Sequence, residues 1–327
     1  MIPAITLADI EDARRRIAGE AVITPLLSHP ALDARAGGRL FVKAECLQRT
    51  GSFKFRGAYN RISRLTDDER LRGVVAFSSG NHAQGVAAAA ALVGCPAVIV
   101  MPADAPRLKI ESTRAMGAEV RLYDRYTEDR EAIGQEISAK RGAILVKPFD
   151  DPFVMAGQGT AGLEIIDQLA ALGLVPDAVA ANASGGGLVA GVNVAVHAKA
   201  PKARLYVAEP KGFEDHALSL RAGRITAHSG RAKTLCDALM APQPGNLTFP
   251  INQTLLTGAL SASDDEVLDA MAMAFRHLKI VVEPGGAVAL ACALRGDLDL
   301  KGGVGVVLAT GGNVDPDTFR LALDKVT

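Results

Sequence analysis

Short runs of apolar residues alternate with helix-compatible stretches through the middle of the chain. In order, the sequence predicts a strand at 74–77, a helix at 82–93, a strand at 97–101, a helix at 107–116, a strand at 119–122, a helix at 127–141 and a strand at 143–146. Short apolar strands that alternate with helices indicate a parallel sheet covered on both faces. We therefore expect residues 73–147 to form one compact α/β unit.

A second alternation of strands and helices follows residue 147, and a few further elements precede residue 73. The sequence predicts helices at 7–18, 54–65, 160–172, 188–198 and 263–277 and strands at 21–26, 39–43, 177–181, 204–209 and 305–308, whereas 212–246 shows no clear periodicity. This discontinuous α/β pattern predicts two domains, each with a mostly parallel sheet flanked by helices. The large domain would comprise 1–72 and 148–327, with 73–147 inserted as the small domain and a ligand in the cleft between them.

Charge and cysteine usage narrow the classes of partner. The 327 residues carry a formal net charge of zero with no basic block, which argues against a nucleic-acid or anionic-membrane partner. Cys46, Cys95, Cys236 and Cys292 show no CxxC spacing and are expected to be reduced thiols. The start lacks the pattern of a secretory signal, and the apolar run 86–93 is too short to cross a bilayer. We expect a soluble, cytoplasmic protein.

One lysine has an unusual setting. Lys54 stands between Phe53 and Phe55, just after the turn at Gly51 and Ser52. Burial disfavours the charged form of a lysine, which lowers its pKa and makes the free amine available for imine chemistry. The alternative is a surface lysine whose stem covers the two rings while its charge stays in water.

A glycine-rich segment lies between a predicted strand and a predicted helix. It consists of Ser184, Gly185, Gly186, Gly187 and Leu188. Successive glycines allow backbone amides to converge on an anion, and the helix N-terminus adds a favourable dipole. The segment therefore predicts a phosphate site, against the alternative of a flexible connecting loop.

A GxGxxG string occurs elsewhere, from Gly157 to Gly162. A dinucleotide-binding fingerprint needs a strand directly before it, and none is predicted here. We interpret the string as a coincidental match, although it leaves an NAD-dependent dehydrogenase as a distant alternative.

Polar residues follow the predicted strand 74–77. The hydroxyl and amide groups of Ser78, Ser79, Gly80 and Asn81 suit a carboxylate at the start of a helix. The alternative for Ser79 is a helix N-cap. His82 is interpreted as part of the helix start rather than as a catalytic base.

Three motifs in this order resemble the fold-type II pyridoxal-phosphate (PLP) enzymes, which have a tryptophan-synthase-β-like fold. The motifs are 52–58, 78–85 and 184–188, and the resemblance runs from about Ala8 to Val314. Within that group the chain is similar to the serine/threonine dehydratase and serine racemase family, possibly to its 3-hydroxyaspartate dehydratases. The resemblance implies that Lys54 binds the cofactor aldehyde and later removes the substrate's α-proton.

The resemblance also assigns the remaining cofactor and substrate contacts. It implies cofactor contacts from Phe53, Lys54, Asn81, Ser184, Gly185, Gly186, Gly187, Leu188, Glu283 and Thr310, and substrate contacts from Ser78, Ser79, Gly80, Asn81 and His82. Thr310 resembles the hydroxyl residue beside the pyridine nitrogen. Because a hydroxyl is too weak an acid to keep that nitrogen protonated, loss of a β-hydroxyl is favoured over transamination. The alternative is a threonine that ends a buried strand.

Two further assignments come mainly from the resemblance. Glu209, Phe213 and Asp215 match the spacing of a site for Mg²⁺, Ca²⁺ or Mn²⁺, with a carbonyl oxygen from Phe213, but they also read as an ordinary acidic loop. Arg130 matches an arginine that can face a second substrate carboxylate, which would favour a dicarboxylic substrate. The alternative is a surface arginine.

The resulting hypothesis is a PLP-dependent dehydratase, or ammonia-lyase, for serine, threonine or 3-hydroxyaspartate. A serine or aspartate racemase would share these residues, and Ser79 favours it, because the resemblance gives that serine a proton on the face opposite Lys54. A β-replacement synthase and a non-enzymatic binding module are further alternatives. The resemblance suggests a homodimer without an isoleucine-regulated domain.

Overall fold

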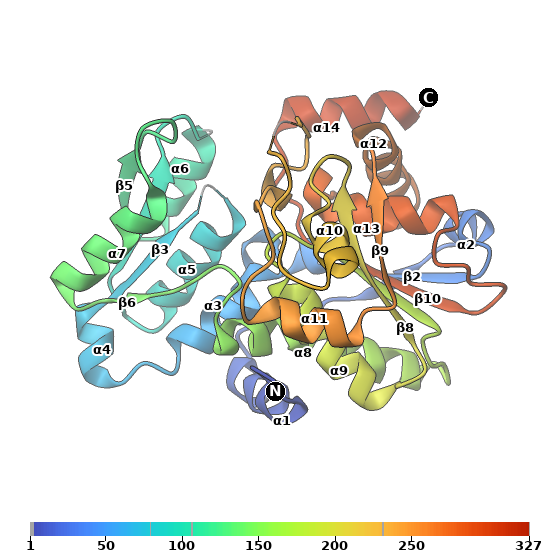
Figure 1. Ribbon diagram of the computed structural model, residues 1–327, viewed down its shortest axis with the longest axis horizontal. Helices are drawn as coiled ribbons and strands as arrows, with labels where there is room; N and C mark the ends of the chain where they lie inside the picture. Colours follow the sequence, from blue (N-terminus) through green and yellow to red (C-terminus); the bar gives the residue numbers. More distant parts are fainter. Residues whose placement is uncertain (1–2, 79, 106, 231, 327) are drawn as a thin grey trace.

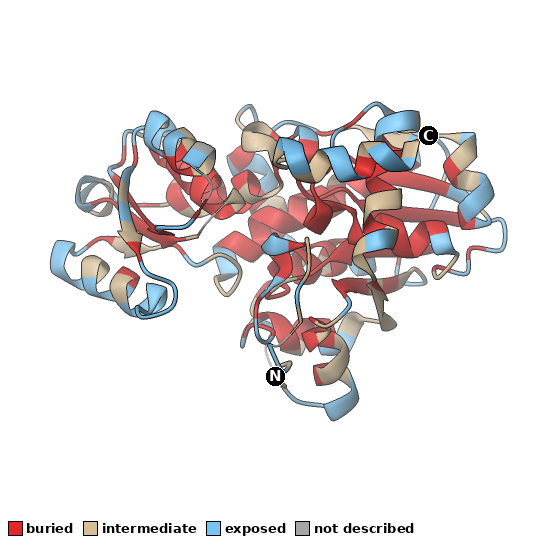
Figure 2. Ribbon diagram, turned by 90° about the horizontal axis from the view of Figure 1, so that it is seen from above, coloured by how far each residue is buried: buried red, intermediate tan, exposed pale blue. Residues whose placement is uncertain are grey.

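The computed structural model describes residues 3–78, 80–105, 107–230 and 232–326, and it contains two sheets flanked by helices (Figure 1). Each sheet has its own core, and both cores are drawn as buried in Figure 2. This arrangement confirms the predicted α/β class. The exact division into 1–72 with 148–327 and 73–147 stays a prediction.

The smaller sheet has four strands in the order β5-β4-β3-β6, and all neighbours are parallel. The strands are β3 (Val74–Phe77), β4 (Ala97–Pro102), β5 (Glu119–Tyr123) and β6 (Ile144–Leu145). Helices α3 (Lys54–Ile62), α5 (Asn81–Leu92) and α6 (Arg107–Ala115) pack on one face, and α7 (Arg130–Arg141) packs on the other. Successive strand residues are buried because both faces are covered.

The larger sheet has six strands in the order β1-β2-β10-β7-β8-β9, and only the edge pair β1–β2 is antiparallel. The strands are β1 (Leu26–Ser28), β2 (Arg39–Lys43), β7 (Ala178–Asn182), β8 (Arg204–Pro210), β9 (Gly258–Ala262) and β10 (Val304–Leu308). Helices α2 (Pro30–Ala36), α12 (Asp264–Met273), α13 (Pro284–Arg295) and α14 (Pro316–Leu323) cover one face. Helices α8 (Pro152–Ala171) and α9 (Gly187–Lys199) cover the other.

The remaining elements lie around these layers. They are α1 (Leu7–Ile17), α4 (Asp67–Arg72), α10 (Asp215–Ala222) and α11 (Thr248–Leu255), with short helical turns η1 (Glu45–Leu47), η2 (Arg49–Gly51), η3 (Asp237–Leu239), η4 (Ala274–Leu278) and η5 (Asp324–Val326). None of the helices in the described ranges combines the length and apolar character that crossing a bilayer requires.

The predicted strand at 21–26 is wrong, since β1 begins only at Leu26. In this segment, side chains make the backbone hydrogen bonds that a neighbouring strand would otherwise make. Gln48 exchanges two hydrogen bonds with the Val22 backbone, at 2.9 and 2.7 Å, and the Lys43 ammonium donates to the Thr24 carbonyl at 2.7 Å. The apolar pattern misled the prediction because Ile23 is 73% exposed.

Several predicted helix ends also need correction. The helix predicted from 160 begins at Pro152, after the N-cap Asp151, and the helix predicted from 127 begins at Arg130, after the N-cap Asp129. The helix predicted at 263–277 is present: a capping box at Ser263 starts α12, and a π-helical turn from Ala274 to Leu278 continues it past the predicted end. The unassigned region 212–246 contains α10 and η3.

The GxGxxG string lies inside α8, so it has no strand–turn–helix context. Its glycines have a packing role instead. A Cβ on Gly157 would lie 2.6 Å from the Gly57 Cα, and one on Gly159 would lie 2.8 Å from the Gly191 carbonyl oxygen. The small residues therefore let α8 pack closely against α3 and α9.

Candidate active site

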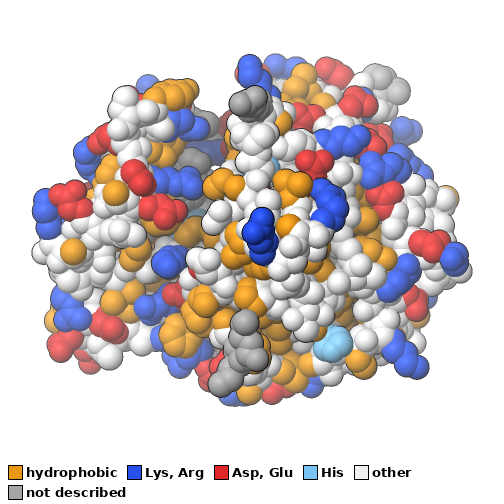
Figure 3. All heavy atoms as spheres, in the orientation of Figure 1, with side chains coloured by type: hydrophobic (Ala, Val, Ile, Leu, Met, Phe, Trp, Pro, Cys, Tyr) orange, Lys and Arg blue, Asp and Glu red, His pale blue; other side chains and the backbone are white. Residues whose placement is uncertain are grey.

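A cavity lies between the two sheets, beyond the carboxyl ends of β3, β7 and β10, where ligands bind in open α/β folds. Its lining combines residues from both sheets: Phe53, Lys54, Phe77, Ser78, Gly80, Asn81, His82, Lys109, Arg130, Pro148, Phe149, Asn182, Ala183, Ser184, Gly185, Gly186, Gly187, Leu188, Asp237, Ala238, Leu239, Met240, Ala241, Glu283 and Thr310. On the face drawn in Figure 3, acidic and basic side chains are interspersed, in keeping with the zero net charge.

Lys54 enters this cavity from the start of α3. Its Nζ donates to the Pro148 carbonyl at 2.8 Å and lies 5.1 Å from the centre of the Phe53 ring. Burial lowers the pKa of Lys54 to about 8, so a free amine is accessible near neutral pH. The expectation of a desolvated lysine, rather than a snorkelling one, agrees with this geometry.

The turn before Lys54 is tied to β10 and to the protein core. The Phe53 amide donates to the Thr310 carbonyl at 3.1 Å. Two residues after Lys54, the buried Arg56 guanidinium forms ion pairs with Glu45 at 2.8 Å and with Glu164 at 2.6 Å. Removing one partner would leave a buried charge unpaired, which is costly. The network therefore holds in place the first turn of α3, from which Lys54 projects.

The glycine segment connects β7 to α9 and has no room for side chains. A Cβ on Gly185 would lie 2.3 Å from the Phe149 ring, and one on Gly186, where φ is +88°, would lie 2.5 Å from Nε2 of His216. Gly187 is the first residue of α9, so its amide and the helix dipole face the cavity end of the helix. This geometry suits a backbone cradle for an anion.

Thr310 lies two residues after the end of β10, and Asn182 positions its hydroxyl. The Asn182 amide donates to Thr310 Oγ1 at 3.1 Å and to the Gly286 carbonyl at 2.8 Å, and its own oxygen accepts from the Ala289 amide at 2.6 Å. Because the hydroxyl oxygen accepts from Asn182, its hydrogen remains available for an acceptor in the cavity. Sequence reasoning missed Asn182, whose only signal was its position at a strand end.

Asn81, Glu283 and Asn313 form a chain of hydrogen bonds. The Asn81 amide donates to Glu283 Oε1 at 2.5 Å, and Asn313 donates to Asn81 Oδ1 at 2.7 Å. Burial, together with the nearby charge of Asp237, raises the pKa of Glu283 to about 7. Sequence reasoning placed Asn81 and Glu283 here but missed Asn313.

The loop after β3 lines the cavity at the N-terminus of α5. Gly80 precedes the first turn of α5, and its amide donates to the Ser78 hydroxyl at 3.2 Å. His82 bonds through Nε2 to the Val146 carbonyl at 2.9 Å, and burial lowers its pKa to about 3, so the ring is neutral. Ser79, the predicted second catalytic residue, lies outside the described residues.

Charged side chains lie at the outer part of the cavity. Arg130 is exposed, with its guanidinium carbon 5.6 Å from the centre of the Phe77 ring. Lys109 and Asp237, neither of which was predicted, form an ion pair at 3.3 Å between α6 and η3. The cavity therefore offers a cation in addition to Lys54 for a ligand with a second anionic group.

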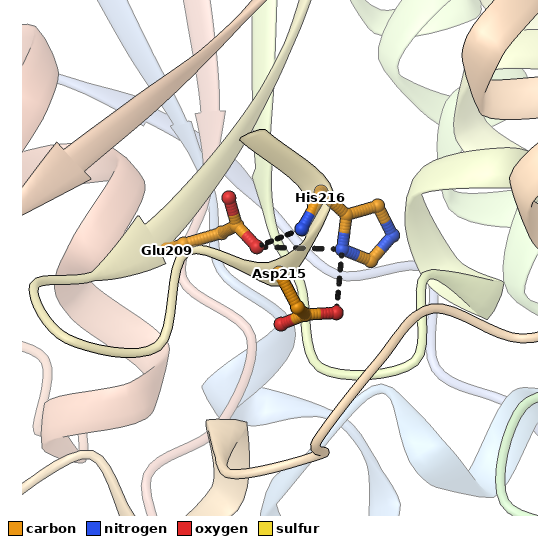
Figure 4. Close-up of side chains that lie close together, drawn as sticks. All are labelled: Glu209, Asp215 and His216. Atoms are coloured by element: carbon orange, nitrogen blue, oxygen red, sulfur yellow. Dashed lines mark hydrogen bonds and ion pairs between the residues drawn. The ribbon is translucent and has the colours of Figure 1, made fainter. Parts of the chain in front are cut away.

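Glu209 and Asp215 lie together at the end of β8 and the start of α10, and His216 completes the cluster (Figure 4). All three are buried, and their potential ligand atoms lie within 4.8 Å of one another. Burial raises the pKa of Asp215 to about 6. Burial alone would lower the pKa of His216, and the facing carboxylates raise it to about 9. Phe213 is buried with its ring against His228, and its proposed carbonyl ligand stays a prediction.

These groups fit PLP. A lysine amine with a lowered pKa, a glycine cradle without space for Cβ atoms, and a hydroxyl with a free hydrogen line one cavity and match the aldehyde, phosphate and pyridine nitrogen of that cofactor. The combination defines a PLP-dependent enzyme of fold type II.

A family model described as "Pyridoxal-phosphate dependent enzyme" matches residues 17–311. The chain belongs to this family, in the branch of serine/threonine dehydratases and serine racemases. It is 42% identical over 315 residues to an L-threo-3-hydroxyaspartate ammonia-lyase from Pseudomonas sp, covering 96% of this chain and 97% of that protein.

Comparison with solved structures assigns the chain to the same family. Maize serine racemase superimposes with a TM-score of 0.91 at 38% identity, covering 98% of each chain. Serine racemase from Dictyostelium discoideum superimposes with a TM-score of 0.89 at 36% identity, covering 95% of this chain and 99% of the other. The comparisons confirm the predicted family, fold and class of enzyme, a PLP-dependent ammonia-lyase.

Proposed function

We propose that the enzyme eliminates water from a β-hydroxy amino acid, with 3-hydroxyaspartate as the preferred substrate, and releases a 2-oxo acid and ammonia. The observation that carries the choice of substrate is Arg130, a cavity-lining guanidinium beside Phe77, which suits the second carboxylate of a dicarboxylic amino acid. The similarity to the Pseudomonas ammonia-lyase supports it.

The positions of the residues support the proposed roles. The Ser184–Leu188 segment and the start of α9 would hold the cofactor phosphate, while Thr310 would donate to the ring nitrogen and Asn81 and Phe53 would contact the ring. When bound, PLP supplies an electron-withdrawing ring that acidifies the α-proton of an attached amino acid.

The chain's own groups would then bind and deprotonate the substrate. The backbone around Ser78, Gly80 and Asn81 and the side chain of His82 would surround the α-carboxylate at the N-terminus of α5. The Lys54 amine, available because burial lowers its pKa, would take the α-proton. The abstracted α-proton and the β-hydroxyl would together leave as one molecule of water, and addition of a second water to the unsaturated product would give the 2-oxo acid and ammonia.

Racemisation is the second candidate, supported by the similarity to maize serine racemase and by the serine at position 79. One assay separates the two functions. The enzyme is given the isomers of serine, threonine and 3-hydroxyaspartate, and both 2-oxo acid release and the chirality of the remaining substrate are measured. Fastest 2-oxo acid release from a 3-hydroxyaspartate isomer supports the proposal, whereas inversion without 2-oxo acid supports the racemase.

Three finer features belong to the same proposal. A divalent cation would bind at Glu209 and Asp215, with the Phe213 carbonyl, because buried carboxylates need a counter-ion. The family suggests a homodimer, which light scattering tests. The four buried, free cysteines suit a reducing compartment and support a cytoplasmic location.

A further inference from the structure

We propose that His216 is a nitrogen ligand of the divalent cation held by Glu209 and Asp215. The site would then prefer a borderline cation such as Zn²⁺ or Co²⁺, and to a lesser degree Mn²⁺, to Mg²⁺ or Ca²⁺. This inference rests on the cation site of the proposed function and deepens it by naming the class of ion. In Figure 4, Nδ1 of His216 is the ring atom that faces both carboxylates.

The polar atoms of this cluster lack ordinary partners. Asp215 is 1% exposed, and neither of its oxygens has a hydrogen-bond donor among the described residues. His216 is fully buried, and within the same part of the chain neither of its ring nitrogens makes a hydrogen bond. Buried carboxylates and imidazoles are normally hydrogen-bonded or bound to a metal. A bound cation would satisfy Asp215 and Nδ1 together.

The distances fit shared ligation better than hydrogen bonding. Nδ1 lies 3.4 Å from Glu209 Oε1 and 3.4 Å from Asp215 Oδ2. Hydrogen bonds from N–H to oxygen usually measure about 2.7–3.2 Å. Two ligands at about 2.1 Å from a tetrahedral ion lie about 3.4 Å apart, and two neighbouring ligands of octahedral Mg²⁺ lie only about 3.0 Å apart.

Glu209 is held in place for this role by the backbone. Its two carboxylate oxygens accept from the amides of His216 at 2.7 Å and Ala217 at 3.0 Å. Each oxygen keeps a second lone pair that can bind a cation. Such supporting hydrogen bonds orient a ligand and raise the affinity of a metal site.

Charge and packing agree with the assignment. Two carboxylates and an imidazole that releases its proton when the metal binds, together with a divalent cation, sum to zero charge. The other side of the His216 ring lies close to the glycine segment, since a Cβ on Gly186 would lie 2.5 Å from Nε2. The ring therefore has little room to turn Nδ1 away from the carboxylates. Imidazole nitrogen suits Zn²⁺ and Co²⁺ best, and Mn²⁺ accepts it more readily than Mg²⁺ and Ca²⁺ do, since those two ions prefer oxygen.

The test uses the cofactor-loaded enzyme after a chelator has removed divalent cations. Mn²⁺ is added back, and pulsed electron paramagnetic resonance reads the nitrogen coupling of the bound ion. We expect the coupling of a directly bound imidazole, and binding of Mn²⁺ at least about tenfold tighter than that of Mg²⁺. This spectrum is recorded on the unmodified protein, so the result does not depend on the folding of a variant.

Two variants identify the nitrogen. His216→Asn places an oxygen near the position of Nδ1, and it should abolish the coupling and reduce the preference for Mn²⁺ over Mg²⁺ by about tenfold or more. His197→Gln, at an exposed histidine near the end of α9, should change neither. If Mn²⁺ binds without nitrogen coupling and with Mg²⁺-like affinity, the role of His216 is refuted while the cation site stands. If neither Mn²⁺ nor Mg²⁺ binds, both the role of His216 and the proposed cation site are refuted.

Discussion

Asn313 donates to Asn81 Oδ1 at 2.7 Å, and the same amide group donates to the Thr50 carbonyl at 2.8 Å. One side chain after β10 thus joins the turn before Lys54 to the first residue of α5. Thr50 has a left-handed backbone, with φ of 63°, so an external hydrogen bond is well placed to hold that turn. Because Asn81 also donates to Glu283, Asn313 determines which end of the Asn81 amide faces each partner.

This relationship predicts different effects for two substitutions of Asn313. Asn313→Ala should lower kcat/KM about tenfold. The variant loses two hydrogen bonds worth about 1 kcal/mol each, and water replaces part of that loss. Asn313→Asp should be worse, since a carboxylate would face the oxygens of Thr50, Asn81 and Gln84. Steady-state kinetics and cofactor titration measure both effects. Equal activity of the Ala and Asp variants would contradict the positioning role.

Lys54→Ala should abolish both the visible absorbance of the bound cofactor's imine and 2-oxo acid formation. The reason is that Lys54 is the lysine whose Nζ is placed in the cavity with its pKa lowered to about 8. Lys54→Arg is the matched control, because it keeps a cation at the site but cannot form an imine. An absorbance spectrum and a lyase assay give the answer. Retention of activity in either variant would remove the proposed mechanism.

Gly186→Ala should prevent cofactor binding, whereas Gly94→Ala should not. Both glycines have positive φ, +88° and +66°, so both substitutions strain the backbone by about 1 kcal/mol. Only at Gly186 does the new Cβ meet neighbours, at 2.5 Å from His216 Nε2 and 2.8 Å from Asn252 Nδ2. Equilibrium dialysis of PLP with both variants separates local steric conflict from general strain. Similar PLP affinities for the two would argue against a tight cradle.

Glu283 should make the cofactor-free enzyme less stable as the pH rises from about 4.5 to 7. Its folded pKa of about 7 lies above the ordinary value of 4.5, so between these values the unfolded chain ionises first and is favoured. The gap between the two pKa values predicts that the free energy of unfolding falls by about 3 kcal/mol between pH 4.5 and pH 7. Urea unfolding at pH 5 and pH 8 measures it, and Glu283→Gln should lose this part of the pH dependence. An unchanged pH dependence in the variant would show that Glu283 ionises normally.

Arg130→Ala should affect dicarboxylic substrates selectively. Loss of a charge-assisted hydrogen bond of about 1.5–3 kcal/mol predicts a decrease in kcat/KM of about 10- to 100-fold for 3-hydroxyaspartate. Serine and threonine lack the second carboxylate, so their kcat/KM should change less than about threefold. Arg125→Ala is the control, because Arg125 is exposed and pairs with Asp104 away from the cavity lining. A parallel decrease for all substrates would assign Arg130 a general structural role.

The sequence by itself determined the family and the order of the parallel α/β units, and it predicted the main cofactor contacts. Apolar strands such as Val74–Phe77 are buried on both faces, so composition alone indicates them. The Lys54 turn and the segment from Ser184 to Leu188 are local motifs, because imine formation and phosphate binding need particular residues that are adjacent in the chain.

Only the tertiary structure decided which distant side chains complete the site. Asn313 and Asn81 are 232 positions apart, and Lys109 and Asp237 are 128 apart, so no local pattern relates them. Residues 21–26 have a strand-like pattern, yet side-chain partners such as Gln48 take the hydrogen bonds that a strand would need. His216 could be read as an ordinary residue of α10 until folding placed it between two carboxylates and a glycine. Contacts between distant residues depend on how the elements pack, and that packing is a property of the whole fold.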